Sequence, residues 1–106
     1  MTGIDDALKR LIERCFALSR DGRLPPASRF AFLQKGKQLR SAFRQLAARQ
    51  FNRNTTAYLA ANSEIAEITR KLAGAARLLK EETAVVEQIG RLAAVLDDLA
   101  KAASVA

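Results

Sequence analysis

The segment RDGRLPPAS, residues 20–28, decides how the first half of this chain folds. It contains both prolines of the sequence, Pro25 and Pro26, together with Gly22. Two consecutive prolines do not continue an α-helix, and glycine readily takes the left-handed conformation that ends one. We therefore expect one helix to stop before this segment, with Gly22 as its left-handed terminal residue. A second helix is expected to start near Pro26 or Ser28.

The residues before this segment have the pattern of an amphipathic helix over about 3–19. Thr2 is expected to cap its N-terminus, and Asp5 and Asp6 lie where carboxylates are favoured at the positive end of a helix. Its apolar residues recur at spacings of three and four, which puts them on one face: Ile4, Leu8, Leu11, Ile12, Cys15 and Leu18. Cys15 is therefore predicted to be a buried structural thiol.

A second helix is predicted over residues 28–52. Its stripe has the same alternation and consists of Phe32, Gly36, Leu39, Phe43, Leu46 and Gln50. The sequence FNRNTTA, residues 51–57, then shifts the phase of the pattern by one residue. Because asparagine and threonine favour turns and helix caps, we expect a connection between helices there.

The remaining chain presents a choice between two helices and one long helix. Its stripe runs from Tyr58 to Ala100, and Glu82 is the charged member. With Tyr58 at heptad position a, the g positions from Leu78 onward are apolar, which is typical of a helix with several neighbours. We therefore predict a turn at residues 80–83 and helices over 55–80 and 83–102. A single helix over this region, which would nearly require a dimer, stays as the alternative because no glycine or proline enforces the break.

Composition supports an all-α protein with a single domain, residues 1–106, folded as a small antiparallel bundle of four helices. Alanine accounts for 21 of the 52 apolar residues and leucine for 14, and both are strong helix formers. One cysteine excludes an internal disulfide, and the N-terminus lacks the apolar segment of a signal peptide. The expected location is the cytoplasm.

The sequence lacks the residues and motifs that most catalytic and metal sites use, so we predict no enzymatic activity, no metal and no cofactor. The chain has no histidine, the commonest general base and a frequent metal ligand. Its carboxylate pairs are adjacent in sequence and diverge by about 100° on a helix, so they do not converge on one metal ion. They are Asp5-Asp6, Glu81-Glu82 and Asp97-Asp98. No phosphate loop or dinucleotide fingerprint is present.

The positive charge of the chain is concentrated in its second helix. Residues 19–53 hold nine bases and one acid, whereas residues 54–106 hold six bases and seven acids. No acid occurs from Gly22 through Ser63. On a helical wheel, Lys37, Arg40 and Arg44 lie to one side of the apolar stripe. A second group, which consists of Lys35, Arg49 and Arg53, lies to the other side.

Three functions are compatible with this distribution. We predict a non-enzymatic, adaptor-like module for protein–protein interaction that binds an acidic protein partner and forms a homodimer. The candidate contacts are basic residues of the second helix and one off-stripe aromatic anchor: Lys37, Arg40, Arg44, Arg49, Phe51 and Arg53. The alternative is nucleic-acid binding by the acid-free segment 22–63. Membrane-surface association is the third function, and it would require the helix to leave the bundle.

Overall fold

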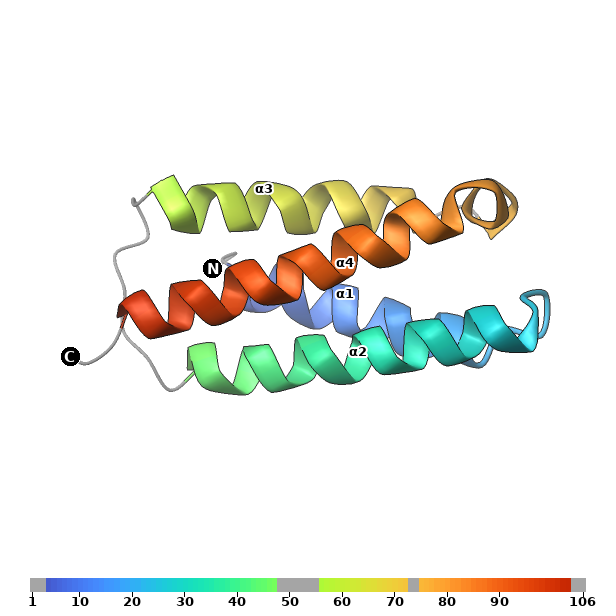
Figure 1. The fold of residues 1–106 in the computed structure, drawn as a ribbon, viewed down its shortest axis with the longest axis horizontal. Helices are drawn as coiled ribbons and strands as arrows, with labels where there is room; N and C mark the ends of the chain where they lie inside the picture. The colour runs from blue at the N-terminus through green and yellow to red at the C-terminus, as the bar shows by residue number, and fades with distance from the viewer. Residues whose placement is uncertain (1–3, 48–55, 73–74, 104–106) are drawn as a thin grey trace.

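The computed structural model describes residues 4–47, 56–72 and 75–103, and it confirms the predicted all-α bundle of four helices (Figure 1). The helices are α1 (Ile4–Ser19), α2 (Pro26–Ala47), α3 (Thr56–Lys71) and α4 (Ala75–Ala103). None of these residues lies in a β-strand. The predicted cap Thr2, the end of the second helix at 52 and the cap residues Asn52 and Thr55 lie outside the described residues.

The helices form a square bundle in which each one packs against two others. Helix α1 contacts α2 and α3, and α4 contacts the same two helices. Consecutive helices run in opposite directions, so α1 is parallel to α3 and α2 is parallel to α4 (Figure 1). Helices α2 and α3 follow each other in sequence but lie on a diagonal, where no close contact occurs between described residues. The bundle therefore has two layers, α1–α2 and α3–α4.

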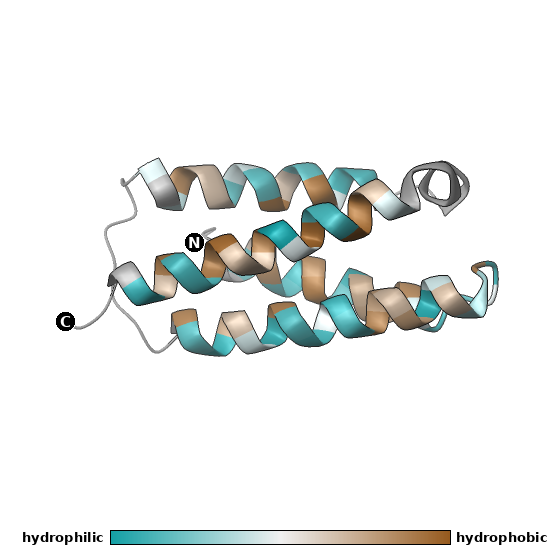
Figure 2. Ribbon diagram, viewed as in Figure 1, coloured by the Kyte–Doolittle hydropathy of each residue, from teal (hydrophilic) through white to brown (hydrophobic). Residues whose placement is uncertain are grey.

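The centre of the bundle is a single apolar core to which all four helices contribute. Its largest fully buried side chains come from each helix: Phe32, Leu8, Leu11, Leu18, Leu39, Leu46, Ile65, Ile68, Leu72 and Ile89. Apolar and hydrophilic residues alternate along the helices, as the sequence periodicity predicts (Figure 2). Most described members of the predicted stripes are buried, but Phe43 is only partly buried at the edge of the core.

The broad apolar arc predicted for the last helix is also confirmed. Val85, Leu92 and Leu99 are buried, whereas Val86 and Ala93 are only partly buried. The apolar arc widens because α4 packs against both α2 and α3.

The connection between α1 and α2 differs from the prediction for Gly22. No described residue has a positive φ, so Gly22 is not a left-handed terminal residue. The last turn of α1 tightens instead, since the backbone N–H groups of Arg20 and Asp21 donate to the carbonyls three residues earlier, each at 3.1 Å. The Asp21 carboxylate then accepts the backbone N–H of Arg23 at 2.9 Å. The Asp21 side chain therefore forms the turn for which a left-handed glycine was predicted.

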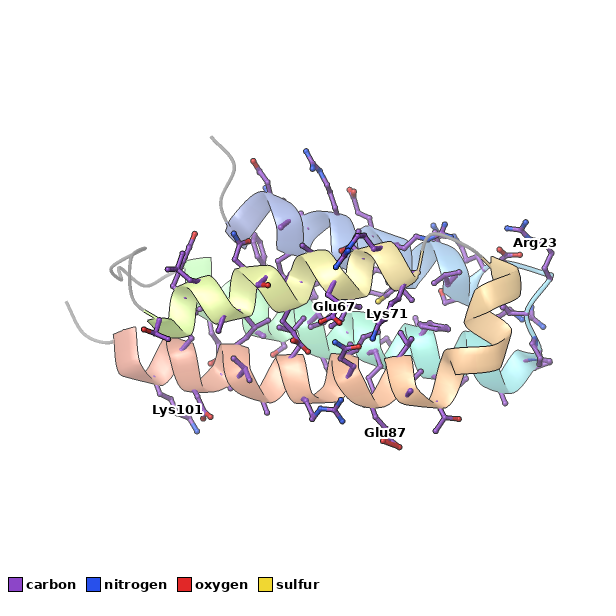
Figure 3. The ribbon with its side chains drawn as sticks, turned by 90° about the horizontal axis from the view of Figure 1, so that it is seen from above. Arg23, Glu67, Lys71, Glu87 and Lys101 are labelled. Atoms are coloured by element: carbon purple, nitrogen blue, oxygen red, sulfur yellow. The ribbon has the colours of Figure 1, made fainter. Side chains whose placement is uncertain are left out.

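The last connection lies earlier in the chain than predicted. Residues 80–83 are helical within α4, so the predicted turn there is wrong, and so is the single long helix. Helix α3 ends at Lys71 and α4 begins at Ala75. The carbonyl of Leu72 accepts Arg14 Nε–H from α1 at 2.9 Å. Helix α4 changes direction within its first turns (Figures 1 and 3). A bend therefore occurs near the place where the sequence pattern predicts a turn.

Candidate interaction face

Three of the predicted contact residues share one exposed surface of α2. Lys37, Arg40 and Arg44 are all exposed, and their spacing of three and four residues places them along one side of the helix. This side borders α1, because the Arg40 guanidinium lies over the ring of Phe16 on that helix. The other candidates, Arg49, Phe51 and Arg53, lie outside the described residues.

Two half-buried phenylalanines support this surface through crossed contacts between α1 and α2. The Arg40 guanidinium carbon lies 5.2 Å from the centroid of the Phe16 ring. In the second contact, Nζ of Lys9 on α1 lies 5.7 Å from the centroid of the Phe43 ring on α2. Cation–π contacts of this kind are worth about 0.5–1 kcal/mol at exposed sites. They hold the two cations on the surface above the seam between the helices.

Sequence reasoning did not assign Lys9 and Phe16 to this surface. The signal available was their separation of seven residues, which places them on one side of α1. The sequence does not show which helix packs against this side of α1, so the contacts of Lys9 and Phe16 with α2 could not be predicted. We call Lys9, Lys37, Arg40 and Arg44 the basic face.

Gly36 allows the two helices beneath the basic face to approach closely. A β-carbon at this position would lie 3.1 Å from Phe16 Cε1 and 3.3 Å from the β-carbon of Cys15. Both distances are shorter than ordinary van der Waals contact. The absence of a side chain at Gly36 therefore gives Phe16 its place under Arg40.

The charges of the basic face are not neutralised within the described part of the chain. The ion pairs found there are Arg23–Asp21 at 2.7 Å and Lys71–Glu67 at 3.8 Å, and neither involves a residue of the face. Asp6 and Glu13 of α1 form no ion pair with these four bases. No acid that the structure describes is therefore paired with a residue of the face.

Lys35 lies on the opposite side of α2, as the helical wheel predicts. Its ammonium donates to Gln38 Oε1 at 3.2 Å and lies beside Gly90 of α4. A polar groove of about 410 Å³ separates α2 from α4 here, and Asp97 contributes a carboxylate to it. Lys35 thus belongs to a mixed-charge groove and not to the basic face.

An exposed aromatic residue extends the basic face toward the N-terminus of α2. Phe30 is 63% exposed, the highest value among the large apolar side chains that the structure describes. It precedes Lys37 by seven residues and Arg44 by fourteen, so all three lie on the same side of the helix. Phe30 therefore offers the apolar contact that the sequence prediction assigned to Phe51.

Reactive groups elsewhere in the described residues are few. Cys15 is buried, and burial raises the pKa of its thiol to about 12, although the nearby Arg14 acts in the opposite direction. Within residues 4–47, 56–72 and 75–103, no cluster of three or more acidic, cysteine or histidine residues has metal-binding geometry. No helix in these ranges has the length and apolarity needed to cross a membrane.

Comparison of the chain with models of protein families, with curated proteins and with solved structures found no match.

Proposed function

We propose that the protein is a non-enzymatic, adaptor-like interaction module that binds an acidic segment of a partner protein on its basic face. The observation that carries this proposal is the lack of any acidic partner for Lys37, Arg40 and Arg44 within the described chain. Bases on a rigid helical surface are well placed for charge-assisted hydrogen bonds to carboxylates.

The dimensions of the face fit a short acidic segment. Lys37 and Arg44 are seven residues apart, which corresponds to about 10 Å along a helix. Phe30 lies about 10 Å further along the same side. A segment with several carboxylates and one apolar side chain would meet the bases and the aromatic ring together, and aromatic anchors commonly contribute much of the affinity at interfaces.

Nucleic-acid binding remains the second candidate, and the exposure of Phe30 supports it. An exposed aromatic ring beside bases is the arrangement that stacks an unpaired nucleotide while its phosphates are neutralised. Membrane-surface association is less well supported. Phe32, Leu39 and Leu46 occupy the core, so α2 would have to leave the bundle to insert them into lipid.

The experiment is capture of partner proteins from a nuclease-treated lysate of the cells that encode the protein. The test variant replaces Lys37, Arg40 and Arg44 by glutamate. The control replaces Arg10, Arg70 and Lys101, exposed bases of α1, α3 and α4, by glutamate. Each replacement changes the charge by two, so both variants have a net charge of +1 where the wild type has +7.

We expect the test variant to lose captured proteins by about tenfold or more, while the control retains them. Capture that is equal in both variants would assign the interaction to net charge and reject the basic face. Capture that occurs in a parallel untreated lysate but is absent after nuclease treatment, together with salt-dependent binding of a purified single-stranded oligonucleotide, would assign the face to nucleic-acid binding.

A further inference from the structure

The layer opposite the basic face carries an apolar groove between α3 and α4. Its volume is about 240 Å³, and its lining is mainly apolar: Ala60, Ala61, Glu64, Arg91, Leu92 and Val95. Ala61 and Leu92 are buried and form part of the core, whereas Ala60 is exposed and Val95 is 42% exposed. The surface thus has one small and one larger apolar residue, bordered by an acid and a base.

Hydrogen bonds around Gln88 fix the level of α3 against α4. Gln88 is 7% exposed, and its amide donates to Glu64 Oε1 at 2.9 Å and to Glu67 Oε2 at 3.4 Å. Its carbonyl accepts Lys71 Nζ–H at 2.9 Å, and Glu67 and Lys71 lie between the two helices in Figure 3. Gln88 therefore lies near the level of Glu67, between the levels of Glu64 and Lys71.

This alignment determines which residues face each other further along the two antiparallel helices. Moving one turn from Gln88 toward the C-terminus of α4 reaches Arg91, close to the level of Glu64. One more turn reaches Val95, close to the level of Ala60 on the facing helix. Both pairs line the same groove, in agreement with this alignment.

A second copy of the chain is complementary to this surface. A two-fold axis parallel to the bundle would place α3 of one copy opposite α4 of the other and leave every residue at its own level. Glu64 would then face Arg91 of the second copy, and Val95 would fill the space above Ala60 of the second copy. Each contact occurs twice, as in any two-fold interface.

One like-charge approach accompanies this arrangement, and the fold offsets it. Glu67 would lie near the level of Glu87 of the second copy. Lys71 Nζ already lies 3.8 Å from Glu67 Oε1, so the local charge at this level is largely balanced. Glu64 and Arg91 form no ion pair within the described chain, so the charges of both side chains are available for pairing with the second copy.

We propose that the protein forms a parallel, two-fold homodimer through its α3–α4 layer, with Glu64 of each copy paired to Arg91 of the other and Val95 packed over Ala60. The basic faces on the α1–α2 layers then point outward on both sides of the dimer. The dimer does not depend on the function proposed for those faces.

Sedimentation velocity over a wide concentration range tests this dimer. We expect the wild type to reach twice its monomer mass of 11.6 kDa. Val95→Glu buries a carboxylate at the centre of the interface. Glu64→Arg and Arg91→Glu each create two like-charge contacts, so each of the three variants should raise the dimer dissociation constant about a hundredfold.

Mixing the two charge variants separates pairing between copies from pairing within one copy. Glu64→Arg and Arg91→Glu should each be monomeric alone and form a heterodimer when combined, because every contact between the two variants is then between opposite charges. Phe30→Glu, on the other layer, should dimerise as the wild type does.

Circular dichroism must show unchanged helical content in every variant that is compared. A wild type that stays monomeric at all concentrations overturns the proposal. So does a dimer that persists unchanged in Val95→Glu, and so does a mixture of the two charge variants that stays monomeric while the wild type dimerises.

Discussion

Gly36 controls the distance between α1 and α2 beneath the basic face. Replacement by alanine would put a methyl group 3.1 Å from the Phe16 ring and 3.3 Å from Cys15 Cβ. Alanine also favours the helix by about 1 kcal/mol relative to glycine, so the two effects oppose each other. Phe16 is only partly buried and can move outward, whereas Cys15 is fixed in the core.

We predict that Gly36→Val lowers the free energy of unfolding by about 1–3 kcal/mol, as overpacking of a close contact does. Valine adds two methyl groups beyond the β-carbon of alanine, and movement of the Phe16 ring alone does not make room for both. Urea denaturation measures the change, and Gly22→Ala is the matched control because nothing lies within 4 Å of a β-carbon there. A Gly36→Val variant as stable as Gly22→Ala would show that the helices can separate without cost.

The sequence predicts the identity of buried residues better than the identity of contacts. Periodicity alone places Cys15 and Leu39 in the core, because the apolar face of an amphipathic helix packs against the other helices. It does not pair Arg40 with Phe16 or Lys9 with Phe43, because these contacts depend on which helix lies beside α2 and at what level. The basic face is therefore partly predictable: its three cations on α2 follow from the sequence, whereas Lys9 and the aromatic support follow from the packing of α1 against α2.

At the scale of the elements, the connection between α1 and α2 depends on one acidic residue. The Asp21 carboxylate accepts the backbone N–H of Arg23 at 2.9 Å and the Arg23 side chain at 2.7–3.2 Å. These hydrogen bonds lower the pKa of Asp21 from 3.8 to about 2. A carboxylate whose pKa is lowered by folding stabilises the fold above its unfolded pKa, and this contribution is lost as the pH falls through the folded value.

We therefore predict that Asp21→Asn lowers the melting temperature at neutral pH, and that the difference from the wild type decreases below about pH 4, is small near pH 2 and vanishes below it. Thermal unfolding across this pH range provides the measurement. Asp97→Asn, a carboxylate of the groove between α2 and α4, serves as the comparison. A difference between Asp21→Asn and the wild type that stays constant from pH 7 to pH 2 would show that the turn does not depend on the charge of Asp21.

The position of the last connection could not be predicted because its cause is tertiary. Within the sequence, Glu82 interrupts the apolar stripe, and this interruption indicates a turn at residues 80–83. In the folded chain α3 ends at Lys71, and Arg14 of α1 satisfies the carbonyl of Leu72. A cap supplied by a residue 58 positions away is not visible in the local sequence, where Gly74 alone marks the connection, whereas the first connection is marked locally by two prolines.

At the scale of the whole molecule, the excess of bases lies on one layer of the bundle. Helix α2 holds five bases and no acid, whereas the three bases and three acids of α1, which forms the same layer, balance each other. Lys37, Arg40 and Arg44 lie within about 10 Å along α2. This separation is well inside the screening length of about 30 Å at 0.01 M salt, and it is comparable to the length of about 10 Å at 0.1 M. The repulsion on this layer should therefore be strong at low salt and weaker at moderate salt.

We predict that added salt stabilises the wild type and raises its melting temperature by about 4 °C, which corresponds to about 1 kcal/mol for a domain of this size. The variant with Lys37, Arg40 and Arg44 replaced by glutamate should melt higher than the wild type at low salt and respond less to added salt.

The variant with Arg10, Arg70 and Lys101 replaced has the same net charge but keeps the crowded bases, so it should still respond to salt. Equal behaviour of the two variants would assign the effect to net charge, and a wild-type melting temperature that falls with salt would show that favourable pairs outweigh the repulsion. A face that costs stability in isolation is expected of a surface whose charges are neutralised by a partner, which connects this measurement to the proposed function.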